Sequence, residues 1–580
     1  MITYTCRNRK QETEEPLPCT NTRCETSRCP SCGGRAEAES EIYWCSQCLV
    51  PLYEKRCSLC GQEGKRLATD VRPVFPEERL LVEIILGKPF AYAEASVWNG
   101  AGNHYFVNGR KIPFSVSSLK EADCHAIRSQ YEDLKHQNTE EYFEKYRQRF
   151  VKANSLRYEK ILEEAGSYIR EKAKDTPVLD MFVSFSGGKD STVTSDLVIR
   201  ALGHPEIMHI FGDTTLEFPS TYEYVKRFRK THPKTPMVSA RNREKDFEGL
   251  CKMIGPPSRV MRWCCTVFKT GVIQKKIRSL FREKNQILTF YGIRRSESVS
   301  RSKYDRESDS PKITKQRIIS PVIDWMDFDI WLYLFTGEID FNEAYRLGYA
   351  RVGCWCCPNN SDWSEFLSSV HMPEQSERFH HLLVEFAESL GKEDAETYVR
   401  EGGWKARQGG NGVAYAGKSV VAFRPCAMEE NTFYYELQRP VSEELYELFR
   451  PFGYLNFEMG HAAMGEVYVL NRQGEMLLKL QGRKGLRELK VTILSVRIAG
   501  ARDLKAAEER VKCQLTKYQM CMGCLACESI CRYNALSVKE KKDGGTEYRI
   551  SDEKCLRCGA CVNHFTAGCY MRKVLSIKRT

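Results

Sequence analysis

The fold of the central part of this chain is decided by one stretch, residues 178–191, which reads VLDMFVSFSGGKDS. Its first half, 178–185, is a short apolar run that predicts a buried strand, and a helical pattern begins after Gly188. Glycines at a strand-to-helix turn let backbone amides approach a ligand closely, and the start of a helix attracts anions. The stretch therefore predicts a loop that holds a phosphate group.

Further strands are predicted over 206–211, 236–240 and 286–293, with helix-length segments between them. Strands that alternate with helices are typical of a parallel sheet covered by helices. The sequence therefore predicts an α/β domain over residues 176–375.

The overall composition is that of a soluble globular protein, because 42% of the 580 residues are apolar and 28% are charged. The apolar run 80–86 contains Glu83 and is far shorter than the ~18 residues that a membrane span needs. No secretory signal is visible near the N-terminus. We therefore expect a cytoplasmic protein of about four domains without a membrane partner. The net charge of +12 leaves a nucleic-acid partner open.

The 26 cysteines are concentrated at the two ends of the chain, with nine in residues 1–60 and eight in 521–580. Most of these are spaced C-x-x-C. In an intracellular protein this spacing favours metal binding over disulfides.

The C-terminal cysteines have the spacing of a ferredoxin with two [4Fe–4S] clusters. The two runs are Cys521-x2-Cys524-x2-Cys527-x3-Cys531 and Cys555-x2-Cys558-x2-Cys561-x7-Cys569. In such ferredoxins the fourth cysteine of each run binds the other cluster. The spacing therefore predicts one cluster on Cys521, Cys524, Cys527 and Cys569, and a second on Cys555, Cys558, Cys561 and Cys531. Two features depart from the usual pattern, namely Arg532 in place of a proline and the long last spacing.

The N-terminal cysteines predict a zinc ribbon, because Cys45-x2-Cys48-x8-Cys57-x2-Cys60 is a pair of metal-binding knuckles. The pair Cys29 and Cys32 could instead combine with Cys45 and Cys48, and the sequence leaves this partition open. A second zinc site could use Cys19, Cys24, Cys29 and Cys32.

A third group of cysteines lies inside the predicted α/β domain. Cys264-Cys265 and the stretch Cys354-Trp355-Cys356-Cys357 bring five thiols from two loops. Four thiolates from such loops suit an iron–sulfur cluster, and zinc is the competing metal.

Three motifs of the central domain together resemble a known family. The string Ser186-Gly187-Gly188-Lys189-Asp190-Ser191 resembles the signature of the PP-loop superfamily, which binds ATP or sulfonucleotides. The stretch 212–219, GDTTLEFP, and the stretch 292–301, GIRRSESVSR, resemble elements of the APS/PAPS (adenylyl sulfate) reductases. The resemblance implies a PP-loop parallel sheet with an adenine nucleotide as substrate.

The resemblance also implies the residues of the site. Nucleotide binding would fall to Ser184, Ser186, Gly187, Gly188, Lys189, Asp190, Ser191, Asp213, Arg294, Arg295, Ser298 and Arg301. A [4Fe–4S] cluster would be bound by Cys264, Cys265, Cys354 and Cys357. The family's E-C-G-L-H cysteine motif does not occur in this sequence. Three alternatives follow: Cys356 or another thiol attacks the sulfur, electrons from the ferredoxin-like region replace the thiol route, or the substrate is not a sulfonucleotide. The catalytic residues expected are Cys356, Lys189, Arg294 and Arg295.

The function expected on this resemblance is reduction of APS or PAPS to sulfite, with electrons from a donor passing through the ferredoxin-like region. Two alternatives remain open: an ATP-using sulfurtransferase that adenylates tRNA, DNA or a small molecule, and an iron–sulfur or nucleotide sensor. The predicted domains are a zinc-ribbon region (1–70), a small β module with a helical linker (71–175), the reductase-like domain (176–375), an α+β domain without assigned chemistry (376–510) and the ferredoxin-type domain (511–580).

Overall fold

The computed structural model describes residues 41–575 except 285, 299–300, 310–315, 411–412, 542–545 and 564–568. It also describes the backbone of β1 (Thr3–Cys6) and β2 (Ala36–Glu39), which pair antiparallel. The cysteines predicted for a second zinc site, Cys19, Cys24, Cys29 and Cys32, lie outside the described residues. Within the described ranges, no helix combines the length and the apolar character that a membrane crossing requires.

The central domain is built on a six-stranded sheet in the order β12-β11-β10-β13-β15-β14. The last strand, β14 (Glu307–Asp309), is antiparallel to its neighbour. The other strands pair in parallel, namely β10 (Met181–Phe185), β11 (Met208–Asp213), β12 (Met237–Arg241), β13 (Ile287–Tyr291) and β15 (Gln316–Ile319). The predicted α/β domain with a parallel sheet is therefore confirmed. Each predicted strand is present within a few residues of its expected bounds.

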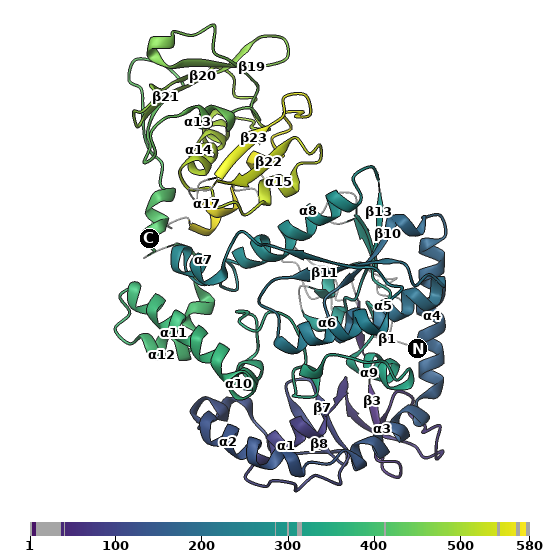
Figure 1. Cartoon of the computed structure of the whole chain (residues 1–580). Helices are drawn as coiled ribbons and strands as arrows, with labels where there is room; N and C mark the ends of the chain where they lie inside the picture. The colour runs from purple at the N-terminus through teal and green to yellow at the C-terminus, as the bar shows by residue number, and fades with distance from the viewer. Residues whose placement is uncertain are drawn as a thin grey trace, which may run out of the picture.

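Both faces of this sheet are buried under helices, as the alternation of side chains along β10 requires. Met181 and Val183 belong to the same buried cluster as α4 (Ser155–Ala173), α5 (Lys189–Leu202) and α9 (Asp327–Thr336). Phe182 points to the other face and packs with α8 (Gly271–Leu280). The long helix α4 runs along one side of the domain (Figure 1). The remaining helices of the domain are α6 (Pro219–Thr231) and α7 (Phe247–Ile254).

Two small antiparallel sheets precede the central domain. The first has the order β4-β3-β5, from β3 (Ile42–Cys45), β4 (Val50–Leu52) and β5 (Lys65–Ala68). The second has the order β6-β7-β8-β9, from β6 (Val71–Pro73), β7 (Val97–Gly100), β8 (His104–Val107) and β9 (Arg110–Lys111). Asn108 and Gly109 join β8 to β9 with φ values of +48° and +78°, as expected of a tight hairpin turn.

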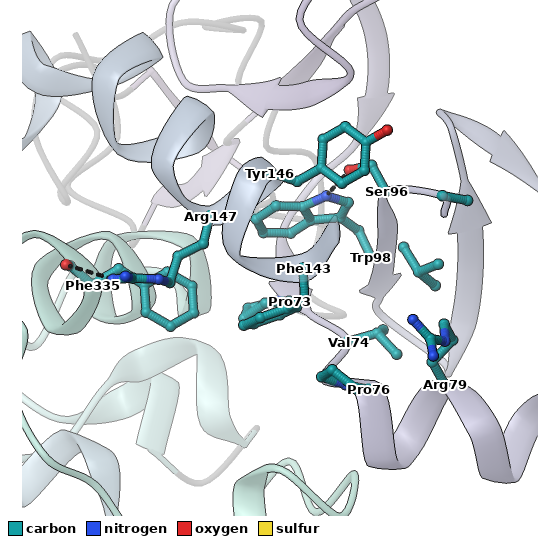
Figure 2. Close-up of a pocket in the computed structure, with 12 residues that line it drawn as sticks. Pro73, Val74, Pro76, Arg79, Ser96, Trp98, Phe143, Tyr146, Arg147 and Phe335 are labelled. Carbon is teal, nitrogen blue, oxygen red and sulfur yellow. Dashed lines mark hydrogen bonds between the residues drawn. The ribbon is translucent and has the colours of Figure 1, made fainter. Parts of the chain in front are cut away.

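Three helices complete this N-terminal region: α1 (Pro76–Ile85), α2 (Cys124–Leu134) and α3 (Glu141–Ala153). Figure 2 shows a narrow pocket where α3 meets α9, with the rings of Trp98, Phe143 and Tyr146 around it. Arg147 of α3 donates a hydrogen bond to the carbonyl oxygen of Phe335 on α9 at 3.4 Å. The pocket therefore marks the seam between the N-terminal region and the central domain.

The region 376–510 contains both helices and strands, as predicted. It follows α10 (Asp362–His371) and begins with α11 (Pro373–Ser389) and α12 (Ala395–Arg400). An antiparallel sheet then has the order β16-β17-β21-β20-β19-β18. Its strands are β16 (Ala422–Pro425), β17 (Thr432–Glu436), β18 (Tyr454–Asn456), β19 (Glu466–Leu470), β20 (Met476–Gln481) and β21 (Glu488–Ile493), with α13 (Glu443–Glu447) beside them.

The C-terminal region lies between this antiparallel sheet and α8 of the central domain (Figure 1). It begins with the long helix α14 (Leu504–Met520). The cysteine-bearing loops that follow are interrupted by α15 (Ala526–Ile530), β22 (Leu536–Glu540), β23 (Thr546–Ile550), α16 (Ala560–Asn563) and α17 (Tyr570–Leu575).

Candidate functional site

The glycine-rich loop stands where the sequence predicts it, between β10 and α5. Gly187 has a φ of +72°, a conformation that L side chains rarely adopt, and a Cβ there would lie 2.9 Å from Thr221. The Ser191 hydroxyl donates to the carbonyl of Gly188 at 2.8 Å and accepts from the amide of Ser186 at 3.2 Å. The Ser186 side chain remains exposed at the lip of the loop.

Two side chains from the segment after α9 fix the shape of this loop. Asn342 donates to the carbonyl of Gly187 at 3.2 Å, and the Tyr345 hydroxyl accepts a hydrogen bond from the amide of Lys189 at 2.9 Å. These two hydrogen bonds fix the backbone of the loop at the start of α5, where the helix dipole favours an anion.

Beneath the loop lies a buried network of charged side chains. The Lys189 ammonium is 3.1 Å from carboxylate oxygens of both Asp190 and Asp327, and Lys189 is only 1% exposed. Arg294, 3% exposed, pairs with the same two carboxylates at 2.5 and 2.8 Å. Burial opposes charge on Lys189, yet the two carboxylates raise its pKa above the ordinary value. Burial likewise opposes charge on Asp190, but Arg294 and Lys189 hold its pKa well below the usual range.

Asp70, from the N-terminal region, joins this network. Its carboxylate accepts hydrogen bonds from the backbone amides of Asp327 at 2.9 Å and Phe328 at 3.1 Å, so it caps the start of α9. Burial and the neighbouring charge of Asp327 raise the pKa of Asp70 to about 7. The N-terminal region therefore supplies part of the floor of the phosphate loop.

The arginines predicted to bind phosphate already have carboxylate partners. Arg294 is held by the network, Arg295 pairs with Asp324, and Arg301 pairs with Glu297. Arg351, which the sequence did not single out, lies 3.5 Å from Glu297 with its side chain 55% exposed. Of these four arginines, Arg301 and Arg351 therefore have the side chains most exposed to solvent.

Two further predicted nucleotide-binding serines make local hydrogen bonds. The Ser184 hydroxyl, on β10, hydrogen-bonds the Tyr291 hydroxyl of β13. The Ser298 hydroxyl accepts from the amide of Arg301 at 3.3 Å.

Asp213 and the residues after it connect the loop edge of the sheet to the central cysteines. The Asp213 carboxylate accepts from the Thr215 amide at 2.9 Å and from the Tyr222 hydroxyl at 3.0 Å. The Thr214 hydroxyl lies 3.4 Å from the Cys354 sulfur. Glu217 forms a β-bridge with Cys354, so the two segments run side by side.

The predicted central ligands are brought together from two loops. The hydrogen bond that the Cys264 thiol donates to Cys265 is the main reason that the pKa of Cys264 is raised, with burial next and the charges of Cys354 and Cys356 adding to it. The hydrogen bond from Cys264 and the nearby cations Arg262 and Lys269 lower the pKa of Cys265 to about 5. The pKa of Arg262 is raised mainly by the charge of Cys265, and the charge of Cys357, the fourth predicted ligand, adds to this rise. A thiolate-rich site flanked by two cations suits a metal or cluster.

Cys356 is buried in the hydrophobic core close to this group. It is 5% exposed, and burial raises its pKa well above that of a free thiol. Cys251, one of the isolated cysteines, lies near enough for its charge to affect Cys356. These surroundings favour the protonated thiol at Cys356.

The N-terminal cysteines form a compact tetrad. The sulfurs of Cys45, Cys48, Cys57 and Cys60 all lie within 4.8 Å of one another. The Cys45–Cys60 and Cys48–Cys57 separations are 3.4 and 3.8 Å, and a tetrahedral ion with Zn–S bonds of ~2.3 Å spaces its sulfurs ~3.8 Å apart. Of the two partitions left open by the sequence, the structure assembles this one. The tetrad fits a zinc ribbon.

In the C-terminal region, the first predicted cluster set lines a single cavity. Cys521, Cys524, Cys527 and Cys569 all face it, together with Lys517 of α14. In the second set, Cys531 lies close enough to Cys555 and Cys561 for its charge to add to the rise in their pKa, which is due mainly to burial, and the charge of Cys558 likewise acts on Cys555. Cys558 is exposed, whereas Cys524, Cys527 and Cys569 are buried.

Lys517 lies between the two sets of cysteines. It is 2% exposed, and its ammonium donates to the carbonyl of Cys561 at 2.7 Å. Burial opposes its charge, but Cys527 and Cys561, from different sets, raise its pKa above the ordinary value. A fixed positive charge next to both sets would stabilise electron-rich clusters.

Several of these residues were not found from the sequence. Asp70, Asp327 and Tyr345 reach the loop from distant segments, and no local pattern marks Asp70 or Tyr345. Lys517 stands four residues before Cys521 in an ordinary-looking helix. Only Asp327 had a recognisable signal, because it opens an apolar helix, where acidic residues are common.

The fold and this loop define the class first: an α/β domain with a parallel sheet and a PP-loop. Comparison with family models then assigns the two domains. Residues 180–360 match the phosphoadenosine phosphosulfate reductase domain, and residues 520–564 match the 4Fe-4S dicluster domain. The chain therefore combines a domain of the phosphoadenosine phosphosulfate reductase family with a ferredoxin-type iron–sulfur domain.

The chain is also similar to individual proteins. The chain is 32% identical to uncharacterized protein MJ0066 of Methanocaldococcus jannaschii over 39% of this chain and 45% of that protein. It is 26% identical to adenosine 5'-phosphosulfate reductase of Anoxybacillus flavithermus over 34% of this chain and 80% of that protein. Among solved structures, phosphoadenylyl-sulfate reductase of Candida auris is 17% identical with a TM-score of 0.27, covering 33% of this chain and 89% of that one. The chain spans less than half the length of MJ0066.

Replacing one ligand of the N-terminal tetrad should remove its metal selectively. We expect Cys57→Ser to lose roughly one equivalent of zinc per chain with unchanged iron, because three thiolates hold zinc less tightly than four. Elemental analysis of the purified protein measures both metals. Cys124→Ser, which changes a half-buried thiol outside the tetrad, is the control. Unchanged zinc in Cys57→Ser would contradict the assignment.

Removing the buried cation between the C-terminal cysteine sets should make the clusters harder to reduce. We expect Lys517→Met to lower at least one cluster midpoint potential by on the order of 60 mV, a tenfold change for one electron. Redox titration followed by EPR measures the potentials. Lys512→Met on the same helix, where Lys512 pairs with Glu508, is the control. An unchanged or higher potential in Lys517→Met would disprove the role of the charge.

Proposed function

We propose that this protein is an iron–sulfur oxidoreductase that reduces an adenylyl sulfate, APS or PAPS, to sulfite. In this reaction the bond between sulfur and the phosphate oxygen breaks. The oxygen keeps the bonding pair and leaves with AMP or adenosine 3',5'-bisphosphate, while the sulfur takes up two electrons and leaves as sulfite.

The observation that carries this proposal is the junction between the nucleotide site and the central cysteines. Asp213 ends β11, beside the strand that leads into the phosphate loop, and Thr214 touches the Cys354 sulfur at 3.4 Å. A nucleotide held by the loop at this edge of the sheet would direct its sulfate toward the cysteines. An enzyme that only bound ATP would have no need of this junction.

The residues of the site have separable roles in the proposal. The loop amides and the exposed Ser186 hydroxyl bind the phosphate, and Arg301 and Arg351 contact the sulfonucleotide from the rim. Lys189, kept charged by its carboxylate partners, neutralises the departing phosphate oxygen. Arg294 and Arg295 orient the loop edge through their ion pairs with Asp190 and Asp324.

The cysteine sets fit iron–sulfur clusters, since thiolates from two loops converge at the centre and four more line one cavity near the C-terminus. Bound clusters would supply electrons to the sulfur one at a time. Cys264, Cys265, Cys354 and Cys357 would hold the central cluster, with Arg262 and Lys269 offsetting its negative charge. Cys356, predicted to be the reactive thiol, has a place in the proposal only if the buried thiol becomes accessible.

An anaerobic product assay tests the proposal. The dithionite-reduced protein is given APS, PAPS and ATP separately, and we expect sulfite with AMP from APS or with adenosine 3',5'-bisphosphate from PAPS. Pyrophosphate from ATP, rising when RNA or DNA is added, would instead support an adenylating sulfurtransferase. The zinc ribbon, a module that can contact nucleic acid, is the observation that favours this second candidate. No turnover of any nucleotide would contradict both.

A charge placed at the lip of the loop should block the nucleotide without disturbing the buried network. We expect Ser186→Glu to lower kcat/KM by roughly 100-fold, because the carboxylate repels phosphate where the loop would bind it. Ser167→Glu, which adds the same charge at an exposed position of α4, should keep wild-type activity. Steady-state sulfite formation measures both. Retained activity in Ser186→Glu would show that the loop does not bind the nucleotide during the reaction.

Loss of one central thiolate should affect only the central cluster. We expect Cys264→Ser to lose part of the visible absorbance and about four iron atoms per chain, while the ferredoxin-type clusters remain. Iron analysis and EPR separate the two populations. Unchanged iron content would show that Cys264 is not a ligand.

A further inference from the structure

We propose that the chain contains a built-in route for electrons with a fixed order. Electrons would enter at the exposed second cysteine set, cross to the buried first set and leave through Tyr570 to the central cysteines. This inference rests on the proposed iron–sulfur function and adds the path, its entrance and the residues that join its parts.

The entrance follows from exposure. Cys558 of the second set is exposed, and Leu556 beside it is 48% exposed. In the first set, Cys524, Cys527 and Cys569 are all buried. An external donor protein can therefore approach the second set more closely than the first.

The two C-terminal sets are adjacent to each other. Lys517 lies against both sets, and its ammonium is 2.7 Å from the carbonyl oxygen of Cys561. Burial opposes the charge of Lys517, but the nearby charges of Cys527 and Cys569 help to raise its pKa. The pKa of Cys561, raised mainly by burial, also responds to the charge of Cys527 in the other set. No separate segment has to move to bring the two sets together.

The exit is a direct contact between the first set and the central cysteines. Tyr570 immediately follows Cys569, and its hydroxyl hydrogen-bonds the side chain of Thr266, which immediately follows Cys265. Burial raises the pKa of Tyr570 to about 12, and the charges of Cys264, Cys265 and Cys524 act on it as well. One side chain therefore touches the surroundings of both cysteine groups.

A second contact fixes this arrangement. A Cβ on Gly271, the first residue of α8, would lie 2.9 Å from the carbonyl oxygen of Thr266, 3.3 Å from that of Cys524 and 3.4 Å from the Cβ of Leu525. Further along α8, Arg278 donates to the carbonyls of Glu528 at 2.5 Å and Cys531 at 2.9 Å. The absence of a side chain at Gly271 lets the ferredoxin-type loop sit directly on the helix that follows the central cysteines.

The order of the path can be tested by following each cluster after mixing with a donor. The full-length, iron-loaded protein is mixed anaerobically with a prereduced bacterial ferredoxin, and EPR samples are frozen at increasing times. The central signal is identified as the one missing in Cys264→Ser. In the wild type we expect the ferredoxin-type signals to appear first and the central signal to follow.

Two variants separate the exit from the entrance. In Gly271→Val we expect the central signal to appear roughly tenfold more slowly, because the added side chain would meet both the Thr266 carbonyl and the Cys524 loop and force the two segments apart, while the other signals keep their rate. Gly417→Val, at a glycine with open space around it, is the matched control. Arg278→Ala, compared with Arg282→Ala on the exposed turn after α8, repeats the test without adding bulk next to Cys265.

A central signal that rises as fast in Gly271→Val and Arg278→Ala as in the wild type would overturn the path, and so would a central signal that appears before the others. Absence of a central signal from the wild type would overturn it as well. Because no nucleotide is present, this experiment is independent of whether APS or PAPS is the substrate. If the protein shows the ordered transfer but forms no sulfite, the result supports the electron path and contradicts only the proposed reaction.

Discussion

The site depends on one buried arrangement of charges, in which Lys189 and Arg294 each contact both Asp190 and Asp327. The four side chains come from the start of α5, the end of β13 and the start of α9, so their pairing fixes three elements relative to one another. Removing one member would leave the others buried without full compensation, at a cost of about 3–5 kcal/mol. The glycine loop above the network therefore has little freedom to change shape.

Next to this rigid network, the glycine loop and the central cysteines lie at the same edge of the sheet. β10 ends in the phosphate loop, and its neighbour β11 ends in Asp213 and Thr214, which lie against the central cysteines. The cysteines in turn contact the C-terminal region through Thr266 and Tyr570. In the proposed reaction, the nucleotide and the two cysteine groups would thus be aligned by parallel strands and direct side-chain contacts.

Features set by neighbouring residues could be predicted from the sequence, and those set by distant contacts could not. The strand before Ser186 and the cysteine spacings are local, and the structure has them where the sequence indicates. Gly292 is similar in kind: a Cβ there would lie 2.5 Å from the backbone oxygen of Asp190, which accounts for the glycine in the GIRR stretch. In contrast, the partners of the arginines in that stretch depend on long-range packing, so a spacing that suggested phosphate ligands could not reveal their carboxylates.

Asp70 connects the N-terminal region to the buried charges of the central domain. It follows β5, which pairs with β3, the strand that ends at Cys45 of the metal tetrad. The same residue caps α9 and stands beside the buried charges under the phosphate loop. The buried charges under the glycine loop are therefore connected through Asp70 to the small sheet that carries the cysteine tetrad, so a metal bound by the tetrad would also support the floor of the loop.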